Sequence, residues 1–187
     1  YKRQEAGAAS DQALRVGYHQ VLQAQLSQPP ETILDLHCTV GLSSFALQES
    51  FPQAAITALD FSPHYLAVAR HEAAIRQINI DAWRHALPEA TGLADRQFDL
   101  ISSFLLFHEM PQDATRRILR EARRLVRPGG CFAVMDMNPD CEAYQTMPKA
   151  LMTLLKSTEP FMYQYFSLDL EDELRHCLLY KSQAADE

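Results

Sequence analysis

The stretch from Glu31 to Asp60 constrains the fold more than any other part of the sequence. A run of β-branched and leucine residues, Thr32 to Leu36, is followed by a short turn, an amphipathic segment and a second apolar run, 54–59, which leads into Asp60. Strand, turn, helix, strand and a terminal acid form the opening βαβ unit of a nucleotide-binding parallel sheet. The acid at the end of the second strand is placed to accept hydrogen bonds from ribose hydroxyl groups.

The remainder of the chain continues this alternation. A helix at 12–26 precedes the unit and is stopped by two prolines. A near-continuous apolar run at 98–107 is typical of a central parallel strand that is covered on both faces. Ser62 caps a further helix, whose buried residues are expected to be Tyr65, Leu66, Ala69, Ala73 and Ile75. Two more strands are expected at 80–87 and 131–137, and between them a helix at 113–126 is stopped by Pro128-Gly129-Gly130. The last expected elements are helices at 148–155 and 168–179 and an aromatic cluster of Tyr163, Tyr165 and Phe166.

Composition and charge indicate a globular protein and narrow its partners. Of the 187 residues, 47% are hydrophobic and 22% are charged, which suits a single domain spanning 1–187. The formal net charge of −7 argues against non-specific binding to nucleic acid, which needs a basic field. No apolar run reaches the ~20 residues of a membrane span, and the cysteines and histidines lack the paired spacing of a metal site. We therefore expect a cytoplasmic protein that binds neither nucleic acid nor membrane.

Four motifs carry a resemblance to a known family. Asp35 is followed by LHCTVG, where the family has any residue and then Gly-x-Gly-x-Gly, so that only Gly41 is kept. The other motifs are LDFSP at 59–63, FDLISSFLLFHEMP at 98–111 and RPGG at 127–130. On these motifs the chain resembles the class I S-adenosylmethionine (SAM) dependent methyltransferases that act on small molecules. The resemblance implies an α/β fold: a Rossmann-like, doubly wound, mostly parallel sheet in strand order 3-2-1-4-5 with helices on both faces.

The resemblance also divides the chain into three parts. Residues 1–28 form a helical segment that either closes over the cofactor cleft as a lid or only covers the sheet edge. Residues 31–140 form the βαβ core, and 141–187 supply helices and a tail. Nothing after Tyr180 can supply the antiparallel strand pair with which the family ends. Either the chain is a fragment, or the sheet ends in an open edge that a protein partner could cover.

The resemblance implies where SAM would bind. Asp35 would meet the ammonium group of the cofactor, Asp60 its ribose, and Phe61 would stack on adenine unless it is a core aromatic under the next helix. The family's adenine-contacting pair falls on Leu87-Pro88, so the usual acid is absent there. The complete set of expected cofactor-binding residues is Asp35, His37, Cys38, Gly41, Asp60, Phe61, Leu87 and Phe104.

His108 is the candidate catalytic residue, because it follows the fourth strand at the edge that faces the ligand. It could contact the methionine part of the cofactor, orient the acceptor or act as a general base. The alternative is a polar turn residue that caps nearby backbone groups.

The altered loop leaves two hypotheses for function. His37 and Thr39 stand where the family has glycines, and threonine at positive φ is strained by about 1–3 kcal/mol. We therefore expect the loop either to take another path or to keep φ below zero at these residues. The favoured hypothesis is a SAM-dependent methyltransferase with a small-molecule acceptor. The alternative is a catalytically inactive domain that has lost SAM and serves as a binding or scaffold module.

Overall fold

The computed structural model describes the backbone of residues 2–178 and the side chains of residues 12–142, 144–155 and 157–175. Its centre is one five-stranded sheet in the order β3-β2-β1-β4-β5, and every neighbouring pair is parallel. The strands are β1 (Thr32–Leu36), β2 (Ala55–Asp60), β3 (Ala82–His85), β4 (Phe98–Phe104) and β5 (Val126–Met135). The predicted strand order is therefore confirmed. No strand follows β5 in the part of the chain that the structure describes.

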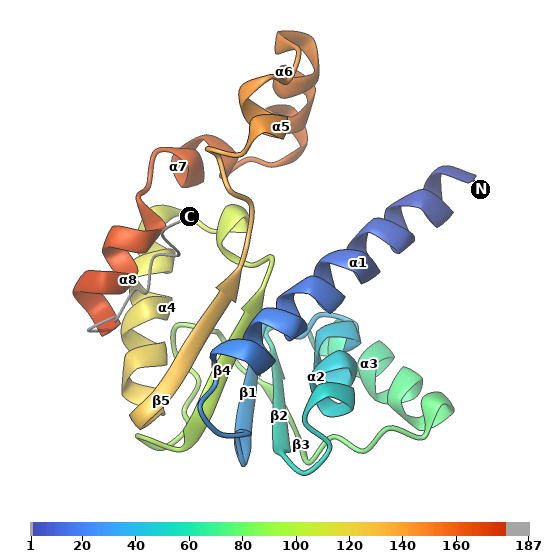
Figure 1. Cartoon of the computed structure of the whole chain (residues 1–187), viewed down its shortest axis with the longest axis vertical. Helices are drawn as coiled ribbons and strands as arrows, with labels where there is room; N and C mark the ends of the chain where they lie inside the picture. Colours follow the sequence, from blue (N-terminus) through green and yellow to red (C-terminus); the bar gives the residue numbers. More distant parts are fainter. Residues whose placement is uncertain (1, 179–187) are drawn as a thin grey trace.

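Helices cover both faces of this sheet (Figure 1). One face carries α1 (Lys2–Gln25), α2 (Leu42–Ser50) and α3 (Pro63–Arg76), and the other carries α4 (Gln112–Leu125) and α8 (Leu170–Leu178). The short η1 (Phe107–Glu109) follows β4, while α5 (Glu142–Gln145), α6 (Lys149–Thr158) and α7 (Met162–Phe166) lie beyond the carboxyl end of β5. None of the described helices is long and apolar enough to span a membrane.

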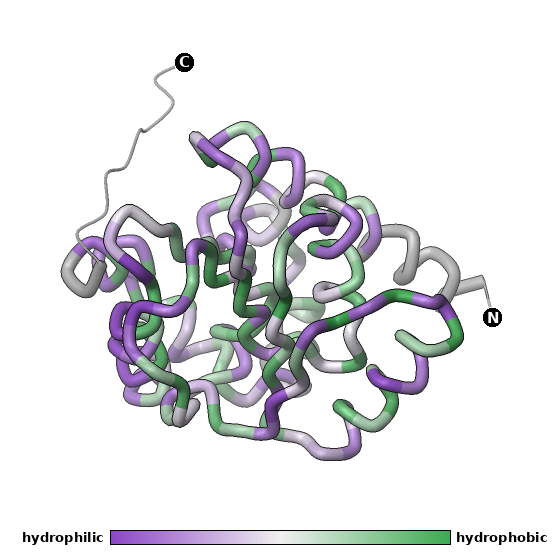
Figure 2. Tube along the Cα trace, turned by 90° about the horizontal axis from the view of Figure 1, so that it is seen from below, coloured by the Kyte–Doolittle hydropathy of each residue, from purple (hydrophilic) through white to green (hydrophobic). Residues whose placement is uncertain are grey.

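Alternation along the central strands creates two cores. Ile33 and Leu100 pack with α1, α2 and α3, whereas Leu34 and Ile101 pack against the other face with Ile118 of α4. All five side chains are fully buried, which contributes about 1.5–3 kcal/mol each. In Figure 2 the hydrophobic residues accordingly follow the strands in the interior, and hydrophilic residues are frequent along the outer helices.

Element boundaries differ from the sequence prediction at several points. The helix predicted from residue 12 begins at Lys2, and the strand predicted to reach residue 107 ends at Phe104, before Leu105 takes a φ of 57°. The fifth strand was predicted from residue 131 but begins at Val126, directly after α4. The Pro-Gly-Gly segment is therefore part of an irregular strand. Gly130 fits there because an added Cβ would lie only 2.8 Å from the carbonyl oxygen of Asp99.

Two predicted buried clusters are partly wrong. On α3, Leu66, Ala69 and Ala73 are buried, but Tyr65 and Ile75 are 45% and 64% exposed. Ile75 lies nine residues after Leu66, which at about 100° per residue is half a turn away from the buried stripe. In the C-terminal aromatic cluster Tyr163 is 70% exposed, and Tyr144 takes its place by packing edge-on against Phe166. Leu179, the last residue of the predicted final helix, lies outside the described residues.

Asp99 fixes the amino ends of three strands. Its Oδ2 accepts the backbone N–H groups of Glu31 (2.9 Å) and Thr32 (3.0 Å) and pairs with Arg127 of β5. Partial burial acts to raise the pKa of Asp99, but these donors outweigh it and hold the pKa below its usual range. The predicted site lies at the opposite ends of the strands, the carboxyl ends.

Candidate functional site

The loop between β1 and α2 has the backbone of a glycine loop with only one of its three glycines. His37, Thr39 and Gly41 have φ values of 76°, 48° and 91°, at the same spacing as the three glycines of Gly-x-Gly-x-Gly. Both expectations for this loop, another path or φ below zero, are therefore wrong. The N–H groups of His37 and Cys38 donate to the carbonyl oxygen of Leu59 at 2.9 and 2.8 Å, and these bonds help to hold the strained conformation.

Gly41 is needed for space as well as for its φ. An added Cβ would lie 2.7 Å from the ring of Phe45 and 3.1 Å from Cβ of Ala69. The close packing of these residues lets α2 begin immediately after the loop. The one glycine that the sequence keeps thus stands where a side chain has no room.

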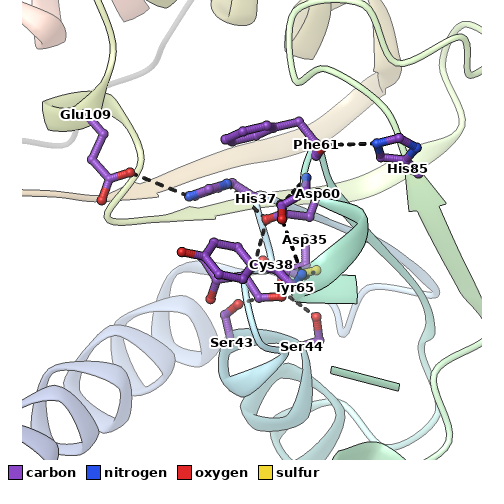
Figure 3. A network of polar contacts seen from close by, with 12 residues as sticks. Asp35, His37, Cys38, Ser43, Ser44, Asp60, Phe61, Tyr65, His85 and Glu109 are labelled. Atoms are coloured by element: carbon purple, nitrogen blue, oxygen red, sulfur yellow. Dashed lines mark hydrogen bonds and ion pairs between the residues drawn. The ribbon is translucent and has the colours of Figure 1, made fainter. Parts of the chain in front are cut away.

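Asp35, at the end of β1, has a fully buried carboxylate with one unpaired oxygen, and it lies next to Ser43 and Ser44 of α2 (Figure 3). Its Oδ2 accepts hydrogen bonds from the hydroxyl groups of Ser43 (2.6 Å) and Ser44 (2.5 Å). Its Oδ1 has no hydrogen-bond partner among the described residues. Burial raises the pKa of Asp35, and the two serines oppose this shift. An unpaired buried carboxylate oxygen suits the ammonium group of a ligand.

Asp60, at the end of β2, is bound by the chain itself. Its Oδ1 accepts the N–H group of Ser62 (2.8 Å), and its Oδ2 accepts that of Thr39 (2.9 Å). The Nδ1 atom of His37 lies 3.1 Å from the same Oδ2. Burial acts to raise the pKa of Asp60, but these neighbours outweigh it and keep the pKa low. Asp60 is therefore an ionised acceptor whose ligand-facing side meets the imidazole of His37.

The His37 ring lies between Asp60 and Phe61 (Figure 3). It stacks on Phe61 with centroids 5.8 Å apart and planes inclined by 7°. Phe61 is 42% exposed, so it is not a core aromatic under α3. His85 also contacts the carbonyl oxygen of Phe61 at 2.9 Å. This arrangement leaves one aromatic face at the surface beside the two strand-end acids.

The other predicted cofactor residues are less closely connected to these acids. Cys38 is buried next to the loop, and burial raises the pKa of its thiol, so it stays protonated. Leu87 is 52% exposed on the turn after β3 and pairs there with Ala90. Phe104 is buried at the end of β4, under the guanidinium group of Arg15. No group of metal-ligating side chains was found among the described residues.

His108 is oriented by a carboxylate that sequence reasoning missed. Its Nδ1 lies 2.7 Å from Oδ1 of Asp136, which follows β5. The same carboxylate accepts the N–H groups of Phe107 (2.6 Å) and Met137 (2.8 Å). Because an ionised carboxylate can only accept, Nδ1 carries the hydrogen and Nε2 is left to exchange a proton. Burial acts to lower the pKa of His108, but Asp136 outweighs it and the pKa is raised.

Glu109 connects the two halves of the site. Its Oε2 lies 4.0 Å from Nε2 of His37, and its Oε1 lies 3.9 Å from Nε2 of His108. The Glu109 side chain is half exposed, so this carboxylate stands at the mouth of the site. The predicted cofactor residues and the predicted catalytic residue thus meet at one surface.

A cavity of about 860 Å³ lies beyond the carboxyl end of β5, and two of its lining residues, Asp136 and Tyr165, contact His108. Tyr165 forms part of its wall, donates a hydrogen bond to the carbonyl oxygen of Met137 (2.8 Å) and packs edge-on against the His108 ring. Among the described residues the lining contains no lysine or arginine, and its acidic residues are Asp136, Asp140, Asp169 and Glu171. The cavity therefore favours neutral or cationic ligands over anions.

Comparison with known proteins shows which protein family this chain is similar to. The family model of the methyltransferase domain matches residues 33–130. An uncharacterised methyltransferase of Synechocystis is 28% identical over 156 residues, which cover 82% of this chain and 69% of the relative. The demethylmenaquinone methyltransferase of Thermus thermophilus is 31% identical over 117 residues, which cover 61% of this chain and 50% of the relative.

A solved structure extends the match over most of the chain. A protein from Galdieria sulphuraria, described as a sarcosine dimethylglycine methyltransferase, superposes with a TM-score of 0.62 at 18% identity. The match covers 94% of this chain and 60% of that protein, and it shows a common fold. This chain spans about two thirds of the Synechocystis relative and half of the Thermus relative.

Proposed function

Since this chain belongs to the class I SAM-dependent methyltransferase family, we propose that it transfers the methyl group of SAM to a small-molecule acceptor. One observation carries this proposal. The loop after β1 has positive φ at residues 37, 39 and 41, the three glycine positions of the family motif, although two of them are not glycine. A chain that keeps this conformation against the preference of its own residues keeps the backbone of a cofactor loop.

The residues at the strand ends fit the cofactor once one side chain moves. The unpaired Oδ1 of Asp35 suits the ammonium group of SAM, and the exposed face of Phe61 suits its adenine ring. Asp60 can accept a ribose hydroxyl at Oδ2 when the His37 imidazole leaves that oxygen. Rotation of the His37 side chain achieves this without changing the backbone bonds of the loop.

Catalysis would then require little more than placement and removal of a proton. SAM, when bound, supplies an electrophilic methyl group on a sulfonium sulfur. The protein has to hold the acceptor in line and to accept its proton where the attacking atom carries one. Nε2 of His108 is the proton acceptor in our proposal. Asp136 holds the opposite nitrogen and so fixes the tautomer that leaves Nε2 free.

The cavity lined by Asp136 and Tyr165, the two neighbours of His108, is our candidate for the acceptor site. Its volume of about 860 Å³ lies within the usual range for sites that bind small molecules. Of the relatives named above, the Thermus protein is named a demethylmenaquinone methyltransferase, and this name refers to a small molecule. The acidic lining directs the search towards neutral and cationic acceptors.

Calorimetric titration with SAM and with S-adenosylhomocysteine tests the proposal. We expect micromolar binding, and a loss of about tenfold to hundredfold in affinity for Asp60→Ala, because a charged acceptor is removed. No detectable binding at millimolar ligand would refute the proposal and would favour the alternative, an inactive module. An unchanged affinity in Asp60→Ala would mean that the ribose is held elsewhere.

A further inference from the structure

The side chain of His37 covers the oxygen that we assign to the ribose in the proposed cofactor site. Its Nδ1 atom lies 3.1 Å from Oδ2 of Asp60, and its ring stacks on Phe61 with 5.8 Å between the centroids (Figure 3). The imidazole is only 5% exposed, and the Asp60 side chain is fully buried. A ribose hydroxyl group therefore competes with the His37 ring for this oxygen.

Carboxylates from three elements act on the His37 ring. Asp60, at the end of β2, faces Nδ1, and Oε2 of Glu109, in η1, lies 4.0 Å from Nε2. Asp35, at the end of β1, is close enough for its charge to interact with that of the ring. None of these carboxylates pairs with a lysine or arginine in the part of the chain that the structure describes. The other titratable neighbours are His108, on the far side of Glu109, and the Cys38 thiol, which stays protonated.

The contact between His37 and Asp60 depends on charge rather than on a directed hydrogen bond. Nδ1 is buried, and it is not aligned for a hydrogen bond with any of the described residues. In a neutral ring Nδ1 therefore presents either a misaligned N–H group or a lone pair, and a lone pair repels the carboxylate. A protonated ring carries a positive charge between Asp60 and Glu109, which attract it from its two nitrogens. The proton thus determines how firmly the ring is held.

We propose that His37 is an autoinhibitory plug of the cofactor site, which a proton on its imidazole holds closed. Opening moves the ring away from Asp60, and the proton passes to solvent. Since the ligand binds only the open form, its binding releases protons, and its affinity rises with pH over the range in which histidine changes its charge. This inference rests on the proposed function and extends it from the site to the regulation of the site.

Titration with 5′-methylthioadenosine isolates the effect of His37. This ligand has the adenine and ribose of the cofactor but no amino-acid end, so the ionisation of Asp35 contributes little to its binding. Its affinity is measured by calorimetry at about pH 5.5 and pH 8, because histidine changes its charge within this interval. We expect the wild type to bind about threefold to thirtyfold more weakly at the lower pH, since the closed form is then more populated.

His37→Gly removes the plug and leaves the loop free of strain, because glycine adopts the φ of 76° easily. At the lower pH this variant should bind more tightly than the wild type, and its affinity should differ by less than about twofold between the two pH values. Titration near neutral pH in two buffers of different ionisation enthalpy counts protons directly. The wild type should release protons on binding, whereas His37→Gly should release none. The same comparison is made with S-adenosylhomocysteine, for which any contribution of Asp35 is common to both proteins.

His71→Gln is the matched control, and Glu109→Gln tests the role of charge. His71 is exposed on α3 and is not one of the residues of the site, so its removal should leave the pH dependence of binding as in the wild type. Glu109 is half exposed and lies 4.0 Å from the ring, so it contributes only part of the attraction. Glu109→Gln should therefore reduce the difference between the two pH values by about twofold without abolishing it.

The inference and the proposed function fail in different ways. If His37→Gly keeps the pH dependence of the wild type, another group is responsible and the inference is overturned. A wild type that binds equally well at both pH values overturns it as well. Either result leaves the proposed function intact, because the ligand still binds. If neither the wild type nor His37→Gly binds 5′-methylthioadenosine or S-adenosylhomocysteine at either pH, the proposed function fails and the inference fails with it.

Discussion

Replacing Thr39 with glycine tests whether the loop after β1 stores strain. Thr39 has a φ of 48°, and holding a β-branched residue there costs about 1–3 kcal/mol. Glycine adopts this φ freely, but its greater freedom in the unfolded chain offsets about 0.5–1 kcal/mol of the gain. The hydrogen bond from Thr39 to Asp60 uses the backbone N–H and survives the substitution. We therefore expect Thr39→Gly to raise the free energy of unfolding by about 0.5–2 kcal/mol.

Urea denaturation measures this effect, and Val40→Gly provides the control. Val40 is the next residue, is partly buried and has no positive φ, so glycine relieves nothing there. Val40→Gly should lower the free energy of unfolding by about 0.5–1 kcal/mol or more. Opposite signs for two adjacent substitutions are difficult to obtain without local strain. If Thr39→Gly instead destabilises the protein as much as Val40→Gly does, Thr39 is not strained and the reasoning fails.

Three other predictions, made with four substitutions, test the site and the sheet. Because burial raises the pKa of Asp35, its ionisation opposes folding, and wild-type stability falls as pH rises through that pKa. Asp35→Asn does not titrate, so its stability relative to the wild type should increase as the pH is raised above about 4, the usual carboxyl pKa, in urea unfolding; a constant difference would contradict the pKa shift. Asp136→Asn should lower the pKa of His108, since the carboxylate that raises it is removed, and NMR titration of the ring measures this; an unchanged pKa would show that other groups hold the proton. Gly130→Ala should destabilise by about 1–3 kcal/mol because its Cβ would lie 2.8 Å from a carbonyl oxygen, whereas Gly17→Ala, in a helix with nothing within 4 Å, should stabilise by about 0.5–1 kcal/mol in thermal or urea unfolding. The same sign for both glycines would contradict the steric argument.

The sheet could be predicted because its signals are local. Buried parallel strands appear in the sequence as short apolar runs, and the acids at the ends of two runs, Asp35 and Asp60, indicate the ligand edge. The start of β5 could not be predicted in this way. Its first residues include a proline and two glycines, and only pairing with β4 makes them a strand.

The loop conformation was predicted wrongly because its causes are distant. His37 and Thr39 disfavour positive φ by themselves, so sequence reasoning assigns them another conformation. The groups that hold the loop, the carbonyl of Leu59 and the carboxylate of Asp60, come from the next strand. The backbone preference of a single residue therefore predicts the wrong φ where hydrogen bonds to a neighbouring strand determine the conformation.

The partners of the key residues were missed for two reasons. Ser43 and Ser44 are ordinary helix residues in the sequence, and only the fold turns their hydroxyl groups towards Asp35. Asp136 had a usable signal, because it is an acid at the end of a strand like Asp35 and Asp60. The protein partner at an open sheet edge stays a prediction.

The polar contacts of the sheet are divided unequally between its two ends. At the amino ends, Asp99 accepts hydrogen bonds and an ion pair from two chain segments, residues 31–32 and Arg127, whereas at the carboxyl ends a buried oxygen of Asp35 has no partner among the described residues and lies beside a strained loop. Random variants selected only for heat resistance would therefore accumulate changes at the carboxyl ends, because substitutions there can remove backbone strain and an unpaired buried oxygen. Such a library would keep the fold and lose the residues of the proposed cofactor site. Thermal stability would then increase through changes at the carboxyl ends of the strands, and activity would be lost at the same ends.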